Sequence, residues 1–136
     1  MVFVEQNADE IRRVLAASGI DILQLHGDIA RDALPQLPRD TGILYAIAVD
    51  VNGSYALPDL RRHELTSRPR AALLLDQPGG GSGRALPWPA MQAPAWPWML
   101  AGGLTQENVS EAVTMLRPAG VDVSGKSMNP PPFVFV

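Results

Sequence analysis

Short apolar runs alternate with helical patterns along most of this chain, and each run ends near a polar residue or a glycine. Runs of this length are too short for helices, and buried strands of parallel sheets have this composition. The predicted strands cover residues 2–4, 20–27, 43–49, 71–75, 98–101 and 121–125. Because strands that alternate with helices are joined by crossovers, the pattern predicts an α/β fold with a parallel sheet.

The segments between these strands contain helix signals of different strength. Asn7 followed by Glu10 resembles a capping box, and Gly19 stands where a helix C-terminal glycine is expected. The proline-rich stretch 87–97 is predicted to be an irregular connection. The predicted helices cover residues 7–19, 29–37, 57–62 and 105–117, and the last of them has Thr105 as its expected N-cap.

Composition excludes several classes of function. A net charge of −3 and a pI near 5.2 leave no basic stripe to neutralise nucleic-acid phosphates. The chain contains no cysteine, and its two histidines, His26 and His63, are far apart, so a zinc site is not expected. No apolar run approaches the roughly 20 residues of a membrane span, and the first residues do not form a signal peptide. We therefore expect a cytoplasmic protein without nucleic-acid or membrane partners.

Distinctive polar residues and glycines follow the predicted strands. His26 ends the second run, Asp76 ends the fourth, and a glycine-rich loop with Arg84 follows Asp76. Gly102-Gly103 and Ser124-Gly125 end the last two runs. In a parallel sheet the carboxyl ends of the strands lie at one edge, where α/β enzymes bind their ligands. Glycines that allow close backbone approach, together with a nearby arginine, suit an anionic substrate.

Six motifs follow one another along the chain: LQLHGD at 23–28, LLD at 74–76, GGSGR at 80–84, LAGGLT at 100–105, ENV at 107–109 and GVDVSG at 120–125. In this order they resemble the later part of phosphoribosylanthranilate isomerase. The resemblance covers roughly residues 2–125 and would make the predicted strands the third to eighth of that enzyme's barrel. It implies an incomplete (β/α)8 TIM barrel that lacks the first two βα units and the last helix. Residues 126–136 are expected to form an irregular, proline-rich tail.

The resemblance also implies an activity in tryptophan biosynthesis. The family converts N-(5-phosphoribosyl)anthranilate into 1-(2-carboxyphenylamino)-1-deoxyribulose 5-phosphate by an Amadori rearrangement, without a metal or an organic cofactor. By resemblance Asp76 is the general acid, and the phosphate binds at Gly102, Gly103, Ser124 and Gly125. The substrate-binding residues would be His26, Gly80, Gly81, Gly83 and Arg84.

Simpler interpretations remain beside these roles. Asp76 could be only a turn or helix cap, and Gly102-Gly103 could be only a tight turn. For His26 a substrate contact and a hydrogen bond to the backbone are equally expected. Asp21 and Asp122 are expected to make local hydrogen bonds rather than to act in catalysis.

One departure from the family pattern is decisive for activity. The family's general base is a cysteine at the end of its first strand, and this chain has no cysteine. We therefore expect the isolated chain to be an inactive fragment that self-associates or needs a complementing N-terminal segment. The alternative is a non-catalytic module for sugar-phosphate binding or assembly, which would bind phosphate ligands without turnover.

Overall fold

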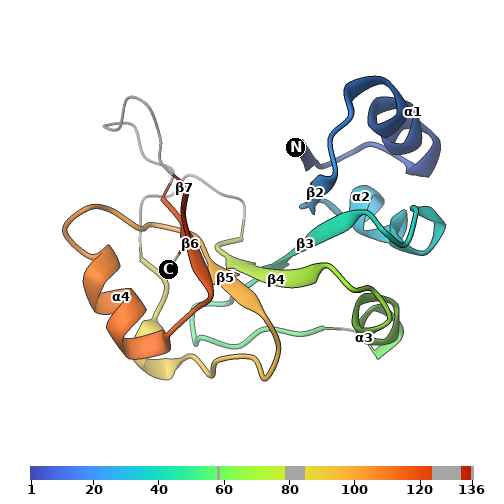
Figure 1. Ribbon diagram of the computed structural model, residues 1–136. Helices are drawn as coiled ribbons and strands as arrows, with labels where there is room; N and C mark the ends of the chain where they lie inside the picture. Colours follow the sequence, from blue (N-terminus) through green and yellow to red (C-terminus); the bar gives the residue numbers. More distant parts are fainter. Residues whose placement is uncertain (58, 79–84, 124–132, 136) are drawn as a thin grey trace. The chain divides into compact units, whose positions relative to one another are not determined.

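The computed structural model describes residues 1–57, 59–78, 85–123 and 133–135 (Figure 1). The chain divides into two compact units. Unit one comprises Met1–Ala46 and Leu57–Ala72, and unit two comprises Ile47–Ala56 and Leu73–Val136. Each unit is described by itself below. In the described residues no helix combines the length and apolar character that a membrane span needs.

Unit one contains parallel strands that pair in sequence order (Figure 1). The strands are β1 (Val2–Phe3), β2 (Ile22–Leu25) and the first part of β3 (Gly42–Ala48). Val2 is in register with Gln24, and Ile22 is in register with Gly42. Phe3, Leu23, Leu25 and Ile43 are buried and form part of the core. The parallel pairing predicted from the sequence is therefore present in this unit.

Helix α1 (Ala8–Ser18) begins and ends where its sequence signals predict. Asn7 Oδ1 accepts hydrogen bonds from the N–H groups of Asp9 (3.0 Å) and Glu10 (3.1 Å). Glu10 Oε2 accepts from Asn7 N–H at 2.8 Å, which completes the capping box. Gly19 ends the helix with a φ of +67°. Ala8 and Ile11 turn the apolar side of the helix into the core.

The other helices of unit one are shorter or longer than predicted. The segment expected to form one helix is divided into α2 (Asp28–Asp32) and the 3₁₀ turn η1 (Leu34–Gln36), because Pro35 cannot continue an α-helical hydrogen-bond ladder. Helix α3 (Asp59–Thr66) extends beyond the short helix that the sequence predicts. After α3, the buried guanidinium of Arg68 donates to the carbonyls of Pro38 (2.6 Å), Leu34 (2.7 Å) and Leu37 (3.0 Å).

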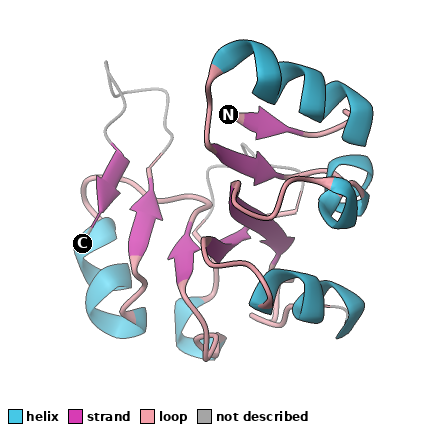
Figure 2. Cartoon of the chain, turned by 45° about the vertical axis from the view of Figure 1, so that its right-hand side comes forward, coloured by secondary structure: helices cyan, strands magenta, loops and turns pink. Residues whose placement is uncertain are grey.

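Unit two contains most of β4 (Ala71–Asp76), together with β5 (Trp98–Leu100) and β6 (Gly120–Asp122), all parallel. Its helical elements are α4 (Val109–Leu116) and the 3₁₀ turn η2 (Trp88–Ala90). Figure 2 also shows β7 (Phe133–Phe135), which pairs with β6 in the antiparallel direction. Most of the predicted irregular tail, residues 126–132 and 136, lies outside the described residues.

The loop after β3 is docked on the segment after η2, within unit two. Gly53 has a φ of +81°, and a Cβ there would lie 2.9 Å from the carbonyl carbon of Ala90. Tyr55 donates its hydroxyl hydrogen to the carbonyl oxygen of Gln92 at 3.0 Å. The Asp50 carboxylate accepts from the N–H groups of Asn52 and Ser54, which closes the loop.

Candidate functional site

Asp76 is the last residue of β4, and its carboxyl group is half-buried. Its Oδ1 atom accepts a hydrogen bond from the N–H of Gln77 at 2.7 Å. Its backbone carbonyl accepts from the N–H of Val49, in the loop after β3, at 2.8 Å. The backbone of Asp76 is thus fixed by the N–H of Val49, and its side chain is fixed by the N–H of Gln77.

The turn after β5 passes directly against Asp76. Gly102 has a φ of +82°, and a Cβ at this position would lie 3.0 Å from Asp76 Oδ1 and 2.8 Å from Gln77 Cγ. Only glycine fits both the backbone conformation and the space. Gly103 also has a positive φ, of +66°. Two parts of the predicted site, the carboxyl group and the glycine turn, are therefore in contact.

Asp122, at the end of β6, belongs to the same group of residues. Leu75, Leu100 and Val121 are in register across β4, β5 and β6, which puts the following Asp76 and Asp122 on one row of the sheet. Burial, and then the negative charge of Asp76, raise the pKa of Asp122 above the usual aspartate value. The local hydrogen bonds predicted for Asp122 stay a prediction, and the charge of Asp76 also acts on its carboxyl group.

The other predicted site residues are not all described. His26 lies in unit one, directly after β2, where its backbone N–H donates to Phe3 and its Nδ1 lies 3.4 Å from Gln24 Nε2. Asp21 forms an exposed ion pair at 2.9 Å with Arg70, a residue distant in the sequence, so this contact is not the local hydrogen bond that was predicted. Gly80, Gly81, Gly83, Arg84, Ser124 and Gly125 lie outside the described residues.

Unit two has a cavity of about 470 Å³ beside the end of β4. Its walls come from the docked loop after β3 and from the chain on either side of the glycine-rich segment. Gln77, which follows Asp76, contributes a buried side chain. The lining residues are Val49, Asp50, Val51, Gln77, Pro78, Ala85, Leu86 and Pro87.

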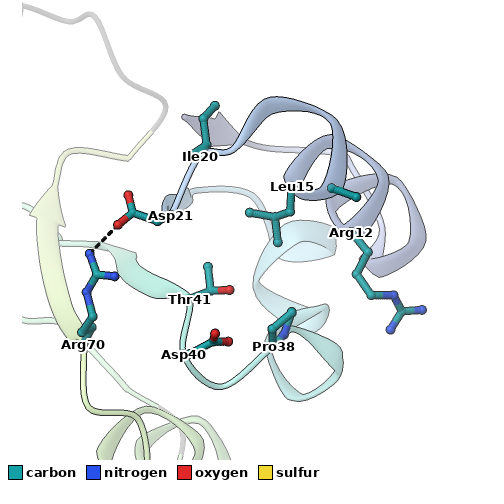
Figure 3. A pocket seen from close by; sticks show the side chains of 9 residues that line it. Arg12, Leu15, Ile20, Asp21, Pro38, Asp40, Thr41 and Arg70 are labelled. Atoms are coloured by element: carbon teal, nitrogen blue, oxygen red, sulfur yellow. Dashed lines mark hydrogen bonds and ion pairs between the residues drawn. The ribbon is translucent and has the colours of Figure 1, made fainter.

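Unit one has a different cavity, of about 530 Å³, at the amino ends of its strands (Figure 3). Asp21, Thr41 and Arg70, which precede β2, β3 and β4, line it together with α1. Figure 3 shows the Asp21–Arg70 ion pair at its edge. His26 follows β2, so within this unit the cavity is at the strand end opposite to the predicted site residue. Among the described residues, no three His, Asp or Glu side chains gather as metal ligands would.

Replacing Asp122 by asparagine is expected to stabilise the chain at neutral pH. Because the folded-state pKa is raised above the usual value near 4, the folded state binds more protons than the unfolded state between these two values. The free energy of unfolding of the parent chain therefore falls as pH rises through this interval. The asparagine variant has no carboxyl group to titrate at this position, so its free energy of unfolding does not fall for this reason. The gain at pH 7 should be on the order of 1 kcal/mol or less, since partial exposure screens the charge.

Urea unfolding of both proteins between pH 4 and 7 measures this effect. The stability difference between the variant and the parent chain should grow with pH through that interval. Asp40→Asn, which removes an exposed carboxylate of unit one, is the control for loss of one negative charge. A difference that does not change with pH would contradict the raised pKa of Asp122.

The comparisons with known proteins agree on one family. The family model described as N-(5'-phosphoribosyl)anthranilate (PRA) isomerase matches residues 1–126. The N-(5'-phosphoribosyl)anthranilate isomerase of Chlamydia caviae is 41% identical over 124 residues, which are 90% of this chain and 57% of that protein. A chloroplastic isomerase of the same name from Arabidopsis thaliana is 33% identical over 129 residues, which cover 90% of this chain and 45% of that protein.

Solved structures give the same result for the fold. The crystal structure of phosphoribosyl anthranilate isomerase from Thermus thermophilus is similar with a TM-score of 0.67 and 30% sequence identity. The similarity covers 90% of this chain and 58% of that one. This chain therefore spans about half the length of the relatives that it matches.

Proposed function

Because the chain belongs to the N-(5'-phosphoribosyl)anthranilate isomerase family, we propose that it carries the acid and phosphate-binding part of such an isomerase. The proposed reaction is the Amadori rearrangement of N-(5'-phosphoribosyl)anthranilate to the aminoketose. The observation that carries the proposal is the contact between Asp76 and the Gly102-Gly103 turn. A phosphate bound at that turn would bring the sugar of the same molecule to the carboxyl group.

Asp76 is proposed as the general acid of the reaction. Proton donation to the furanose ring oxygen opens the ring, and removal of the C2 proton then converts the aminoaldose to the aminoketose. Asp122, whose pKa is raised by burial and by Asp76, is a neighbouring group that retains a proton at a higher pH than an exposed aspartate. Ser124 and Gly125 are proposed to complete the phosphate site, and His26 with the glycine-rich loop and Arg84 to contact the rest of the substrate.

The general base is proposed to come from a complementing polypeptide segment. The chain has no cysteine to match the family's base, and it spans 57% of its Chlamydia relative. In unit one, β1 has exposed apolar neighbours that such a segment could cover: Met1, Val2, Val4 and Ile22. We propose that these residues contact the preceding βα units of an otherwise incomplete (β/α)8 barrel, and that the protein works in the cytoplasm.

Reconstitution tests the proposed function. The chain is mixed with the part of the Chlamydia caviae relative that precedes the matched region, and conversion of N-(5'-phosphoribosyl)anthranilate is followed. Turnover should appear in the mixture and in neither component alone. Phosphate binding without turnover in the mixture would instead favour the second candidate, a non-catalytic module that binds sugar phosphates. The observation that favours this candidate is that the chain has no cysteine.

In the reconstituted mixture, Asp76→Asn should lower turnover on the order of 100-fold, because an amide cannot donate the acid proton. Asp50→Asn is the matched control, since Asp50 lies in unit two like Asp76 but its carboxylate accepts bonds only from its own loop among the described contacts. An asparagine oxygen can still accept those bonds, so this variant should keep its turnover. An Asp76→Asn mixture within a few-fold of the parent would exclude Asp76 as the acid.

A further inference from the structure

The side chain of Asn108 reaches back from the start of α4 to the glycine turn after β5. Its Nδ2 group donates to the carbonyl of Gly103 at 3.0 Å, and its Oδ1 atom accepts from the N–H of Thr105 at 2.7 Å. We propose that Asn108 is a positioning residue that fixes the Gly103–Leu104 peptide, so that the Leu104 N–H is presented to the substrate phosphate. This inference rests on the phosphate site proposed above.

The geometry of the peptide bond determines the direction of the Leu104 N–H. In a planar trans peptide the carbonyl and the following N–H point in opposite directions. Because Asn108 holds the carbonyl of Gly103, the N–H of Leu104 must point away from Asn108. The bond to Thr105 fixes the next peptide as well, so one side-chain amide holds both peptides that flank Leu104.

A second observation concerns the backbone N–H groups of Gly103 and Leu104. Among the described residues, none accepts a hydrogen bond from the N–H of Gly103 or Leu104. The Leu104 side chain is buried, which anchors the turn on the core. Backbone N–H groups that are oriented together and unused by the fold can bind an anion.

Asn108 does not act as an ordinary helix cap. An asparagine N-cap normally accepts a hydrogen bond from the second or third N–H of its own helix. Asn108 makes no such bond to α4, and its backbone is helical, with φ −113° and ψ −14°. Its side chain therefore holds the turn and does not cap the helix. Loss of this side chain is expected to affect the turn more than the stability of α4.

Without Asn108 the turn has other conformations available. Gly103 has no side chain to restrict it and already adopts a φ of +66°, so its peptide can rotate at small cost. Asn108→Ala removes both hydrogen bonds. Asn108→Asp keeps an acceptor for Thr105 N–H but has no hydrogen to donate to the Gly103 carbonyl. Gln106→Glu is the control for added charge, because Gln106 is an exposed amide in the same turn.

Titration of the ¹⁵N-labelled full chain with inorganic phosphate tests the proposal, with the amide resonances of Gly103 and Leu104 as the signal. The parent chain should show saturable shifts at both amides. Asn108→Ala and Asn108→Asp should bind phosphate at least fivefold more weakly and lose the Leu104 shift. Gln106→Glu should show a smaller loss of affinity and keep the Leu104 shift.

The outcomes separate this inference from the proposed function. Equal phosphate affinity and an unchanged Leu104 shift in both Asn108 variants would overturn the role of Asn108 and leave the phosphate site intact. No phosphate-dependent shift in the parent chain would overturn the phosphate site and the role of Asn108 together. Far-ultraviolet circular dichroism of each variant reports whether α4 is retained, and Asn108→Asp carries the test if Asn108→Ala does not fold.

Discussion

Gly27→Ala should destabilise the chain by about 3 kcal/mol or more, the largest effect expected of any substitution considered for this fold. A Cβ at this position would lie 2.0 Å from the carbonyl oxygen of Val4 and 2.7 Å from its carbonyl carbon. The obstructing atoms are backbone, so no rotamer change can relieve the overlap. The end of β1 would have to move away from the end of β2, where His26 N–H donates to Phe3 at 2.9 Å.

Urea unfolding followed by circular dichroism measures this loss. Gly19→Ala is the matched control, because Gly19 has a φ of +67° but a Cβ there would have no neighbouring atom within 4 Å. That variant should cost only the left-handed backbone penalty of about 1 kcal/mol. If the two alanine variants unfold at the same urea concentration, the close approach of β1 to Gly27 is not a constraint on the fold.

Arg68→Met should destabilise the chain by about 2–3 kcal/mol. Arg68 is only 5% exposed, and its guanidinium group satisfies three backbone carbonyls of η1 and the following residues. Methionine retains the unbranched stem but leaves these buried acceptors without a donor, which costs more than the average hydrogen bond contributes. Burial already lowers the pKa of Arg68, so part of the loss is offset by the removal of a poorly solvated charge.

The contrast with Arg70→Met isolates the buried hydrogen bonds. Arg70 is exposed and pairs only with the exposed Asp21 among the described contacts, so its loss should cost at most about 0.5 kcal/mol. Arg68→Lys should fall between the two methionine variants, because one ammonium group cannot reach all three carbonyls with guanidinium geometry. Equal unfolding midpoints for the Arg68 and Arg70 methionine variants would contradict a structural role for Arg68.

Local signals in the sequence predicted most of the elements, and their failures have physical causes. Asn7, Glu10 and Gly19 determine α1 through contacts within a few residues, so its bounds were predictable. The start of α4 could not be predicted from such local signals. Thr105 has the side chain of an N-cap, but the helix begins at Val109, because Asn108 draws residues 103–108 into a turn through its two hydrogen bonds. A contact made by one amide with two peptides cannot be deduced from helix periodicity.

The parts of the candidate site that depend on a residue type with a particular backbone conformation were predictable from the sequence. The parts that depend on the register between strands were not. Gly102 and Asp76 stand at strand ends, and their contact follows from neighbouring parallel strands. The position of Asp122 on the same row as Asp76, with β5 between them, requires the register of three strands, which no single run of residues encodes. The sequence signal that could have found it is its place in the last strand, one residue after the run that pairs with β5.

The shared register of β4, β5 and β6 also bears on how this family can change length during evolution. Side chains alternate between the two faces of a strand, so insertion or deletion of one residue within β4 would turn Asp76 to the opposite face. The apolar residues of β4 can exchange for others of similar volume, since their task is to fill the core. A change of length within β4 should therefore disturb the position of Asp76 more than an exchange of its apolar residues does.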